Sequence, residues 1–215
     1  MSQVGVLRFP GTNCDRDVFE ACAATGLNPA WLWHADRFDP ASYESLFIPG
    51  GFSHGDYLRS GALAARAPAM SSVREAAARG TPVLGICNGF QILCEAQLLP
   101  GALIRNETLR FIDDWVQVRV VEPGRHFARE LKSGQPARLP IAHADGRWVA
   151  EADELRALRD RGQVWLTYVT NPNGSTGDVA GLTNEKKNVA ALMPHPERAL
   201  FEWMGGADGS SFFRH

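Results

Sequence analysis

The stretch that decides the fold reads Val83-Leu84-Gly85-Ile86-Cys87-Asn88-Gly89 and runs directly into a helix-like stretch over 90–98. A short apolar run that leads through a glycine-flanked cysteine into a helix is the nucleophile-elbow pattern, with cysteine in place of serine. The glycines permit a cramped turn between strand and helix, and the positive end of the helix favours a thiolate. A buried structural cysteine is the alternative interpretation, because free cysteine is among the most buried residue types.

Apolar runs of the same kind lie upstream of this elbow. We expect strands over 4–9, 30–33, 46–48 and 83–86, and a helix over 62–78 that ends at Gly80-Thr81-Pro82. Strands that alternate with helices predict a parallel sheet covered by helices on both faces. The first half of the chain is therefore expected to be doubly wound.

The first helix of this half has its own start and stop signals. Thr12 is expected to cap it, with Asp15 three residues on as in a capping box, and Gly26 is expected to end it. The face predicted to be buried holds Val18, Cys22 and Ala23.

The middle of the chain has a different pattern, because 115–121 alternates polar and apolar residues and 137–142 is another short apolar run. These runs predict antiparallel strands inserted beside the sheet. A helix near 152–161 and strands over 164–169, 179–182 and 189–193 are expected to follow. The predicted fold is a single α/β domain over 1–215, an open and mostly parallel sheet of the flavodoxin-like type with a small antiparallel insertion.

Composition restricts the partners and the compartment. The chain has 215 residues, 45% of them hydrophobic, and a net charge of −2, which is too weak a field to recruit nucleic acid or an anionic membrane surface. The four cysteines show no C-x-x-C spacing, and the N-terminus lacks the apolar stretch of a signal peptide. We expect a cytoplasmic protein that binds no metal, no nucleic acid and no membrane.

A thiol nucleophile needs a base, and His195 is the best candidate because Glu197 stands two residues later. In an extended segment such residues point to the same side, so the carboxylate can orient the imidazole. The prolines at 194 and 196 are expected to stiffen this geometry. A histidine near a strand end is otherwise an ordinary core or surface group.

Acyl transfer also needs hydrogen-bond donors for the oxyanion. Pro49-Gly50-Gly51-Phe52 follows another predicted strand, so the Gly51 backbone N–H is one candidate donor. The residue after the nucleophile, Asn88, is expected to supply the second N–H. Both loops lie at the carboxyl ends of parallel strands, where open α/β sheets bind ligands. A glycine pair after a strand is otherwise only a tight turn.

Taken together, Gly85-x-Cys87-x-Gly89-x-Gln91, the upstream Pro49-Gly50-Gly51 and the late His195-Pro196-Glu197 resemble the class I (triad) glutamine amidotransferases. Four longer blocks, 9–15, 50–59, 171–175 and 193–199, are similar to the family of glutaminase subunits of phosphoribosylformylglycinamidine synthase. These blocks extend from near the N-terminus to near the C-terminus.

The resemblance implies a role for each motif residue. Cys87 would attack the side-chain amide of glutamine, His195 would transfer protons, and Glu197 would orient His195. It also implies that Phe52, Gln91 and Asn106 contact the substrate. Two positions stand apart: Asp145 occupies a place where the family is expected to carry glutamate, which leaves the roles of His143 and Asp145 open, and Cys14 is interpreted as a core or loop thiol.

The resemblance also implies partners. No G-x-x-x-x-G-K-[ST] phosphate loop occurs in the sequence, so an acceptor would have to be activated on another polypeptide. That partner would be the synthetase PurL, with the small protein PurS bridging the assembly. PurL would use ATP and Mg to convert formylglycinamide ribonucleotide to formylglycinamidine ribonucleotide in de novo purine biosynthesis, while this chain would need no cofactor.

Three other functions compete with this one. An α/β-hydrolase shares the elbow, but its acid precedes its histidine in the chain, whereas Glu197 follows His195. A DJ-1/PfpI-like cysteine hydrolase or chaperone would carry an acidic residue before the elbow cysteine, where this sequence has Ile86. A non-catalytic regulatory binding subunit would not need all three of Cys87, His195 and Glu197.

Overall fold

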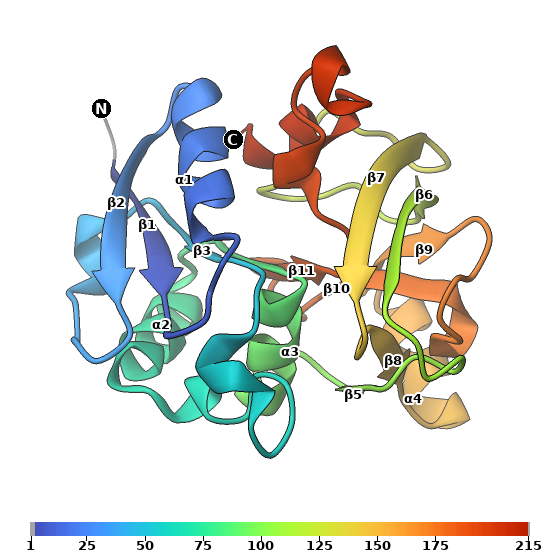
Figure 1. Cartoon of the computed structure of the whole chain (residues 1–215), viewed down its shortest axis with the longest axis horizontal. Helices are drawn as coiled ribbons and strands as arrows, with labels where there is room; N and C mark the ends of the chain where they lie inside the picture. Colours follow the sequence, from blue (N-terminus) through green and yellow to red (C-terminus); the bar gives the residue numbers. More distant parts are fainter. Residues whose placement is uncertain (1–2, 215) are drawn as a thin grey trace.

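The computed structural model describes residues 3–214, whose strands form one nine-stranded sheet and one two-stranded sheet. Along the large sheet the order is β2-β1-β3-β4-β11-β10-β9-β6-β7 (Figure 1). The strands are β1 Gln3–Arg8, β2 Asn28–Trp33, β3 Ser45–Ile48, β4 Val83–Ile86, β5 Ala102–Ile104, β6 Ile112–Val120, β7 Pro136–His143, β8 Arg147–Val149, β9 Val164–Tyr168, β10 Val179–Thr183 and β11 Val189–Leu192. The α-helices are α1 Asp15–Ala24, α2 Pro68–Arg79, α3 Asn88–Glu95 and α4 Ala152–Asp160.

The half of the sheet from β2 to β11 is parallel, as the alternation of strands and helices predicts. In β3, β4 and β11 every residue is buried, which is the pattern of strands covered on both faces. In Figure 1, α1 lies on one side of these strands, and α2 and α3 lie on the other. The predicted doubly wound α/β fold is confirmed.

The antiparallel part is arranged differently from the prediction. β6 pairs with β9 and β7 pairs with β6, so both strands extend the large sheet instead of lying beside it. Their residues alternate between buried and exposed, as expected where one face of a sheet meets solvent. The separate antiparallel unit is the small sheet of β5 and β8.

The first two helices correct the predicted boundaries. Cys14, not Thr12, is the residue before α1, and the Thr12 hydroxyl instead accepts a hydrogen bond from the Phe9 N–H at 3.1 Å. Ala23 is exposed, and Ala21 takes its place on the buried face. The expected helix over 62–78 is interrupted after a short 3-10 turn, because Pro68 favours the first position of a new helix.

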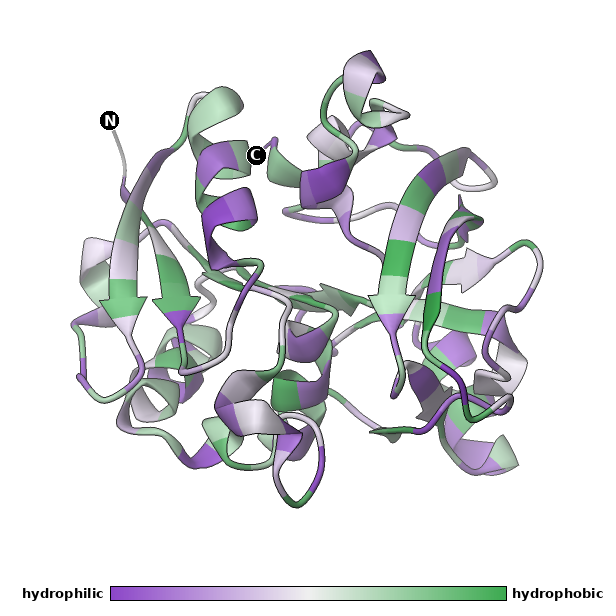
Figure 2. Cartoon of the chain, viewed as in Figure 1, coloured by the Kyte–Doolittle hydropathy of each residue, from purple (hydrophilic) through white to green (hydrophobic). Residues whose placement is uncertain are grey.

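The hydrophobic core lies along the sheet. Figure 2 shows mostly hydrophobic residues on the central strands and a mixture of hydrophobic and hydrophilic residues on α1 and α4. The largest fully buried side chains include Trp148, Trp165, Phe47 and Phe90. Within residues 3–214, no helix is both long enough and apolar enough to cross a membrane.

Candidate active site

Three neighbouring parallel strands end at the candidate site. Cys87 follows β4, the glycine pair follows β3, and the segment that carries His195 follows β11. Cys87 adopts φ 51° and ψ −104°, an uncommon conformation that is typical of a sharp strand-to-helix turn. Its N–H donates to the Leu192 carbonyl at 2.8 Å, so the elbow is tied directly to β11.

The second glycine of the elbow allows a close approach of helix to strand. A Cβ atom at Gly89 would overlap with the carbonyl oxygen of Ile48, at the end of β3. Only glycine therefore lets α3 begin this close to the neighbouring strand. The resulting turn leaves Cys87 only 5% exposed but on the wall of a cavity.

His195 and Glu197 form a buried pair. The Nδ1 atom of His195 lies 2.6 Å from Oε1 of Glu197, and the His195 backbone N–H donates to the Pro140 carbonyl at 2.8 Å. The predicted contact is present, but the expected extended geometry is wrong. Pro196–Arg198 is a 3-10 turn, and this turn brings the carboxylate back onto the imidazole.

The electrostatics favour a charged imidazole. Burial lowers the pKa of His195, but the charges of Glu197 and Cys87 outweigh burial and hold that pKa well above its usual value. The Nε2 atom of His195 is buried and has no hydrogen-bond partner of ordinary length among residues 3–214. An imidazolium with a free Nε2 beside a thiol is suited to supporting a thiolate and donating a proton.

A second thiol, Cys14, interpreted from the sequence as a core or loop thiol, lies beside these residues. The side chains of His195, Cys87 and Cys14 all lie close to Gly50. A Cβ atom at Gly50 would lie 2.7 Å from Cε1 of His195, 3.3 Å from Cβ of Cys87 and 3.4 Å from Sγ of Cys14. Burial raises the pKa of the Cys14 thiol, and the nearby His195 opposes this shift. Cys14 follows β1, whose carboxyl end lies beside that of β3, and this strand order was the signal that could have located it.

Cys14, His195 and Glu197 also satisfy the spacing of a metal site, since one ligand atom from each lies within 4.8 Å of the others. Cysteine, histidine and carboxylate ligands would suit zinc. However, Arg198 Nη2 is a cation 3.1 Å from the Cys14 sulfur, and Glu197 already holds Nδ1 of the histidine. These contacts fit a hydrogen-bonded cluster better than a metal, and the expectation that the chain binds no metal remains a prediction.

The proposed oxyanion donors flank Cys87. Gly51 lines the same cavity as Cys87, and Asn88 is the first residue of α3, where a backbone N–H has no partner within the helix. The neighbouring Phe52 N–H is already used, because it donates to the Gly11 carbonyl at 2.9 Å. The Asn88 side chain accepts from the Ser53 N–H at 3.2 Å and so ties the glycine loop to the elbow. The oxyanion roles of Gly51 and Asn88 remain predictions.

Two cavities adjoin the cluster. The one that Cys87 lines has a volume of about 30 Å³. The other, of about 190 Å³, is lined by Cys14 and His195. The two cavities share the walls Gly51, Phe52 and Ala142. The half-exposed Phe52 therefore lies between the two cavities, where its movement would join them.

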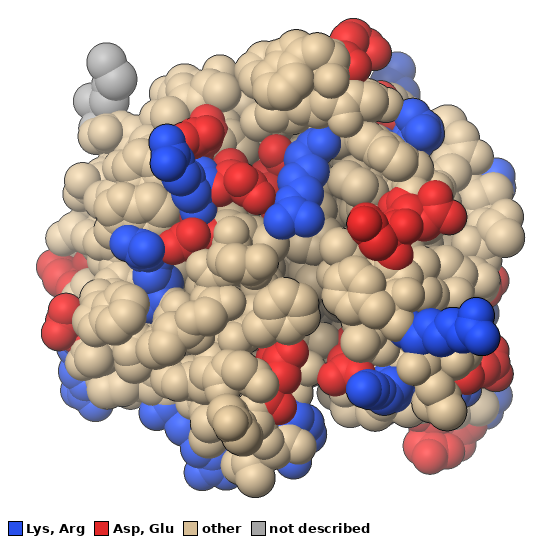
Figure 3. Space-filling model, viewed as in Figure 1, with Lys and Arg blue, Asp and Glu red and all other residues tan. Residues whose placement is uncertain are grey.

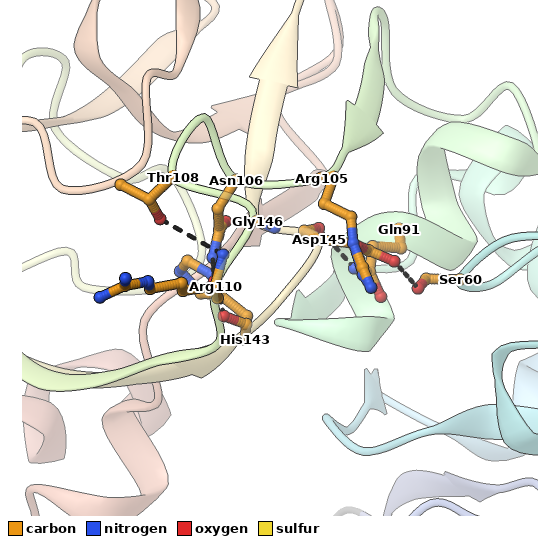
Figure 4. Close-up of polar contacts among 9 residues, drawn as sticks. All are labelled: Ser60, Gln91, Arg105, Asn106, Thr108, Arg110, His143, Asp145 and Gly146. Atoms are coloured by element: carbon orange, nitrogen blue, oxygen red, sulfur yellow. Dashed lines mark hydrogen bonds and ion pairs between the residues drawn. The ribbon is translucent and has the colours of Figure 1, made fainter.

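Two of the predicted substrate contacts, Gln91 and Asn106, lie in a hydrogen-bonded network beside the cavity at Cys87 (Figure 4). Gln91 lines the cavity, accepts from Asn88 Nδ2 at 2.8 Å and donates to the Asp145 carbonyl at 2.7 Å. Asn106 is fully buried, and its amide nitrogen donates to the carbonyls of His143 and Arg110, each at 2.9 Å.

The Asn106 oxygen is also engaged, because it accepts from the Gly146 N–H at 3.0 Å and lies 3.1 Å from Nδ1 of His143. Two donors and two acceptor positions exhaust the hydrogen-bonding capacity of an amide. The Asn106 side chain therefore has no free donor or acceptor in this structure, and its contact with the substrate remains a prediction. This side chain positions the segment that carries His143 and Gly146.

Residues 1–208 match the family of CobB/CobQ-like glutamine amidotransferase domains. The PurQ subunit of phosphoribosylformylglycinamidine synthase from Helicobacter hepaticus is 50% identical over 208 residues, which cover 97% of this chain and 94% of that protein. The chain belongs to the PurQ family of glutamine amidotransferases. PurQ of Rubrobacter xylanophilus is 47% identical, over 99% of this chain and 96% of that protein.

Solved structures agree with membership of the PurQ family. A chain of the PurLQS structure from Thermotoga maritima superposes with a TM-score of 0.90 at 44% identity, covering 98% of this chain and 95% of that one. A glutamine amidotransferase from the same organism gives a TM-score of 0.62 at 19% identity, over 92% of this chain and 76% of that one, and supports the fold alone. The predicted resemblance is confirmed, and the DJ-1/PfpI-like alternative is not the family that the chain matches.

Proposed function

We propose that this chain is the glutaminase subunit of a phosphoribosylformylglycinamidine synthase, which hydrolyses glutamine to glutamate and ammonia. One observation carries the proposal: an elbow cysteine on a cavity wall, next to a buried His195–Glu197 pair with a 2.6 Å contact. Membership of the PurQ family supports the same function.

In the proposed reaction, the Cys87 thiolate attacks the side-chain carbonyl carbon of glutamine. The Gly51 and Asn88 N–H groups stabilise the oxyanion, and His195 donates a proton to the departing nitrogen, which leaves as ammonia. Water then attacks the γ-glutamyl thioester, with His195 accepting its proton. Glutamate leaves, the thiolate is restored, and Glu197 supports the imidazolium in both half-reactions.

The ammonia would be used by a partner. Named relatives are PurQ subunits, and a similar solved chain belongs to PurLQS. We propose that PurL takes the ammonia, uses ATP and Mg, and converts formylglycinamide ribonucleotide to formylglycinamidine ribonucleotide, with PurS in the assembly. The chain would act in the cytoplasm as one glutamine amidotransferase domain over 1–215, without a cofactor of its own.

The test is reconstitution of the complex with glutamine or with ammonium as the nitrogen source. Cys87→Ala should abolish glutamine-dependent amination and leave ammonium-dependent amination nearly intact, because the thiol only generates ammonia. Cys94→Ala, in the same helix but outside the site, is the matched control and should retain both activities. Equal loss of both activities in Cys87→Ala would refute the proposal.

A further inference from the structure

The cavity at Cys87 is acidic at the end away from the base. Its wall includes two carboxylates, Asp56 and Asp145, and the hydroxyl of Ser60 lies there with them. Figure 3 shows a narrow hollow in the lower middle of this face with acidic side chains on both rims. Nothing in the proposed hydrolysis of the amide uses these carboxylates.

Asp145 is only partly compensated. Its Oδ2 accepts a hydrogen bond from Ser60 Oγ at 2.8 Å, but its Oδ1 is buried without a hydrogen-bond partner among residues 3–214. Arg105 Nε lies 3.6 Å from Oδ1, beyond hydrogen-bond distance, and the Arg105 side chain is 57% exposed (Figure 4). Arg59, from the adjoining loop, donates from Nε to Oε1 of Glu95 at 2.5 Å. Its charge is therefore engaged away from Asp56 and Asp145.

Asp56 adds a second carboxylate to this wall. Its Oδ1 is also buried without a partner in the described part of the chain. Burial, and then the charge of Asp145, raise the pKa of Asp56 to about 6. Two carboxylates that repel each other across a small space are stabilised by a cation placed between them.

His143, on the same cavity wall, is an acceptor as well. It is 3% exposed, and its Nε2 has no partner among residues 3–214. Since the Asn106 amide nitrogen donates to two carbonyls, the Asn106 oxygen must accept from Nδ1–H of His143, which leaves Nε2 unprotonated. Burial lowers the pKa of His143 to about 4, so the ring stays neutral near neutral pH.

Three side-chain atoms on this wall lack a hydrogen-bond partner within residues 3–214, and all are acceptors: two carboxylate oxygens and one imidazole nitrogen. A ligand that satisfies them must bring N–H donors and a positive charge. Glutamine carries such a group, its α-ammonium, at the end of the molecule opposite the amide that Cys87 would attack.

We propose that Asp56 and Asp145 bind the α-ammonium group of glutamine, while Nε2 of His143 offers a further acceptor to a substrate N–H. This inference rests on the proposed glutaminase function and adds the groups that select an α-amino acid. Ser60 is a positioning residue, because its hydroxyl holds Asp145 in place.

Substrate entry must widen the site. A cavity of about 30 Å³ holds roughly one or two waters, not a glutamine molecule. Asp56 ends the 3-10 turn Ser53–Asp56 that follows Phe52, and His54, Asp56 and Leu58 in this loop all have positive φ. Displacement of Phe52 and seating of the ammonium on Asp56 are thus linked through a few residues of strained backbone.

Two electrophiles that differ only in the α-amino group test the inference on this chain within the assembled complex. In 2-amino-5-chloro-4-oxopentanoate and in 5-chloro-4-oxopentanoate, the Cys87 sulfur displaces chloride and forms a thioether. The rate of each adduct is measured by intact-protein mass spectrometry, and peptide mapping confirms the site. The wild-type chain should react faster with the amino compound.

Asp145→Asn should slow adduct formation by the amino compound about 10- to 100-fold, the range expected for a lost charge-assisted hydrogen bond. The rate of adduct formation by the des-amino compound should stay within about threefold of the wild-type rate. Asp56→Asn should act in the same direction, and Asp145→Glu should keep the preference because it keeps the charge. Asp153→Asn, on the exposed surface of α4, is the control and should change neither rate.

Either of two results overturns the inference. The first is equal reaction of the wild-type chain with both compounds, and the second is equal slowing of both compounds in Asp145→Asn, which would indicate a structural effect on the thiol. The glutaminase proposal is tested independently, because the comparison of glutamine with ammonium in Cys87→Ala does not depend on how the α-amino group is bound.

Discussion

Glu197→Gln isolates the charge of the acid in the proposed triad. The substitution keeps the size of the side chain and an oxygen that can still accept from Nδ1 of His195, but it removes the negative charge 2.6 Å from the ring. Both side chains are almost completely buried, so solvent does not screen the loss. The variant therefore tests whether the carboxylate supports an imidazolium.

The expected size follows from the pKa of His195. Burial lowers that pKa, and the charge of Glu197 is the first of the contributions that raise it. An opposite charge in contact is worth about 1–3 pKa units, and one unit corresponds to about 1.4 kcal/mol. The loss of transition-state stabilisation should thus be about 1.4–4 kcal/mol, or a 10- to 1000-fold fall in kcat for glutamine hydrolysis.

The assay is glutamate release by the assembled complex as a function of pH. Glu197 holds His195 protonated to higher pH, so its removal should move the limb that reports His195 to lower pH. His195→Ala is the reference and should be nearly as damaging as Cys87→Ala, because His195 handles protons in both half-reactions. Ammonium-dependent amination should be unchanged in all three variants.

Some results would refute this reasoning. A fall of less than about threefold with an unshifted pH profile would mean that Glu197 does not support the imidazolium. A shift of the His195 limb to higher pH in Glu197→Gln would mean that Glu197 lowers the pKa of His195 instead of raising it. Independent, multiplying effects of Cys87→Ala and His195→Ala in a double variant would mean that the two residues do not act as a unit.

Two further predictions concern the glycine loop and the loop beyond it. Gly50→Ala should lower glutaminase activity by at least about tenfold with little change in ammonium-dependent amination, because the added Cβ would displace the imidazole of His195. Unchanged glutamine hydrolysis would contradict the close approach of His195 to Gly50. The free chain should hydrolyse glutamine about 100- to 1000-fold more slowly than the complex with acceptor and ATP, because Phe52–Gly61, with its exposed Tyr57 and Leu58, is suited to be set by a docked partner. Equal rates in the free chain and the complex would show that the site is already assembled.

Much of the fold was predictable because its signals are local. β4 and the start of α3 follow from an apolar run and two glycines around Cys87, and the contact of His195 with Glu197 follows from their short separation. The reason given for that contact was wrong, because a 3-10 turn after β11 lies outside what strand periodicity can report. The attachment of β6 to β9 was also missed, since strand pairing depends on distant segments.

The residues around the site that the sequence could not place share one property: their neighbours depend on position in space. Cys14 reaches His195 only because β1 lies beside β3 in the sheet. Asp56 and Asp145 come from loops far apart in the chain and meet at Ser60. Asn106 looked like a ligand-binding amide, but its buried partners are visible only in the folded structure.

The position of β11 has a consequence for synthesis of the protein. β11 is inserted between β4 and β10, and its Val189 pairs with Val83 of β4, far earlier in the chain. Such distant pairing forms late, because both strands must have left the ribosome before they can pair. Cys87 thus emerges before His195, and the proposed triad cannot assemble in a nascent chain before β11 completes the sheet.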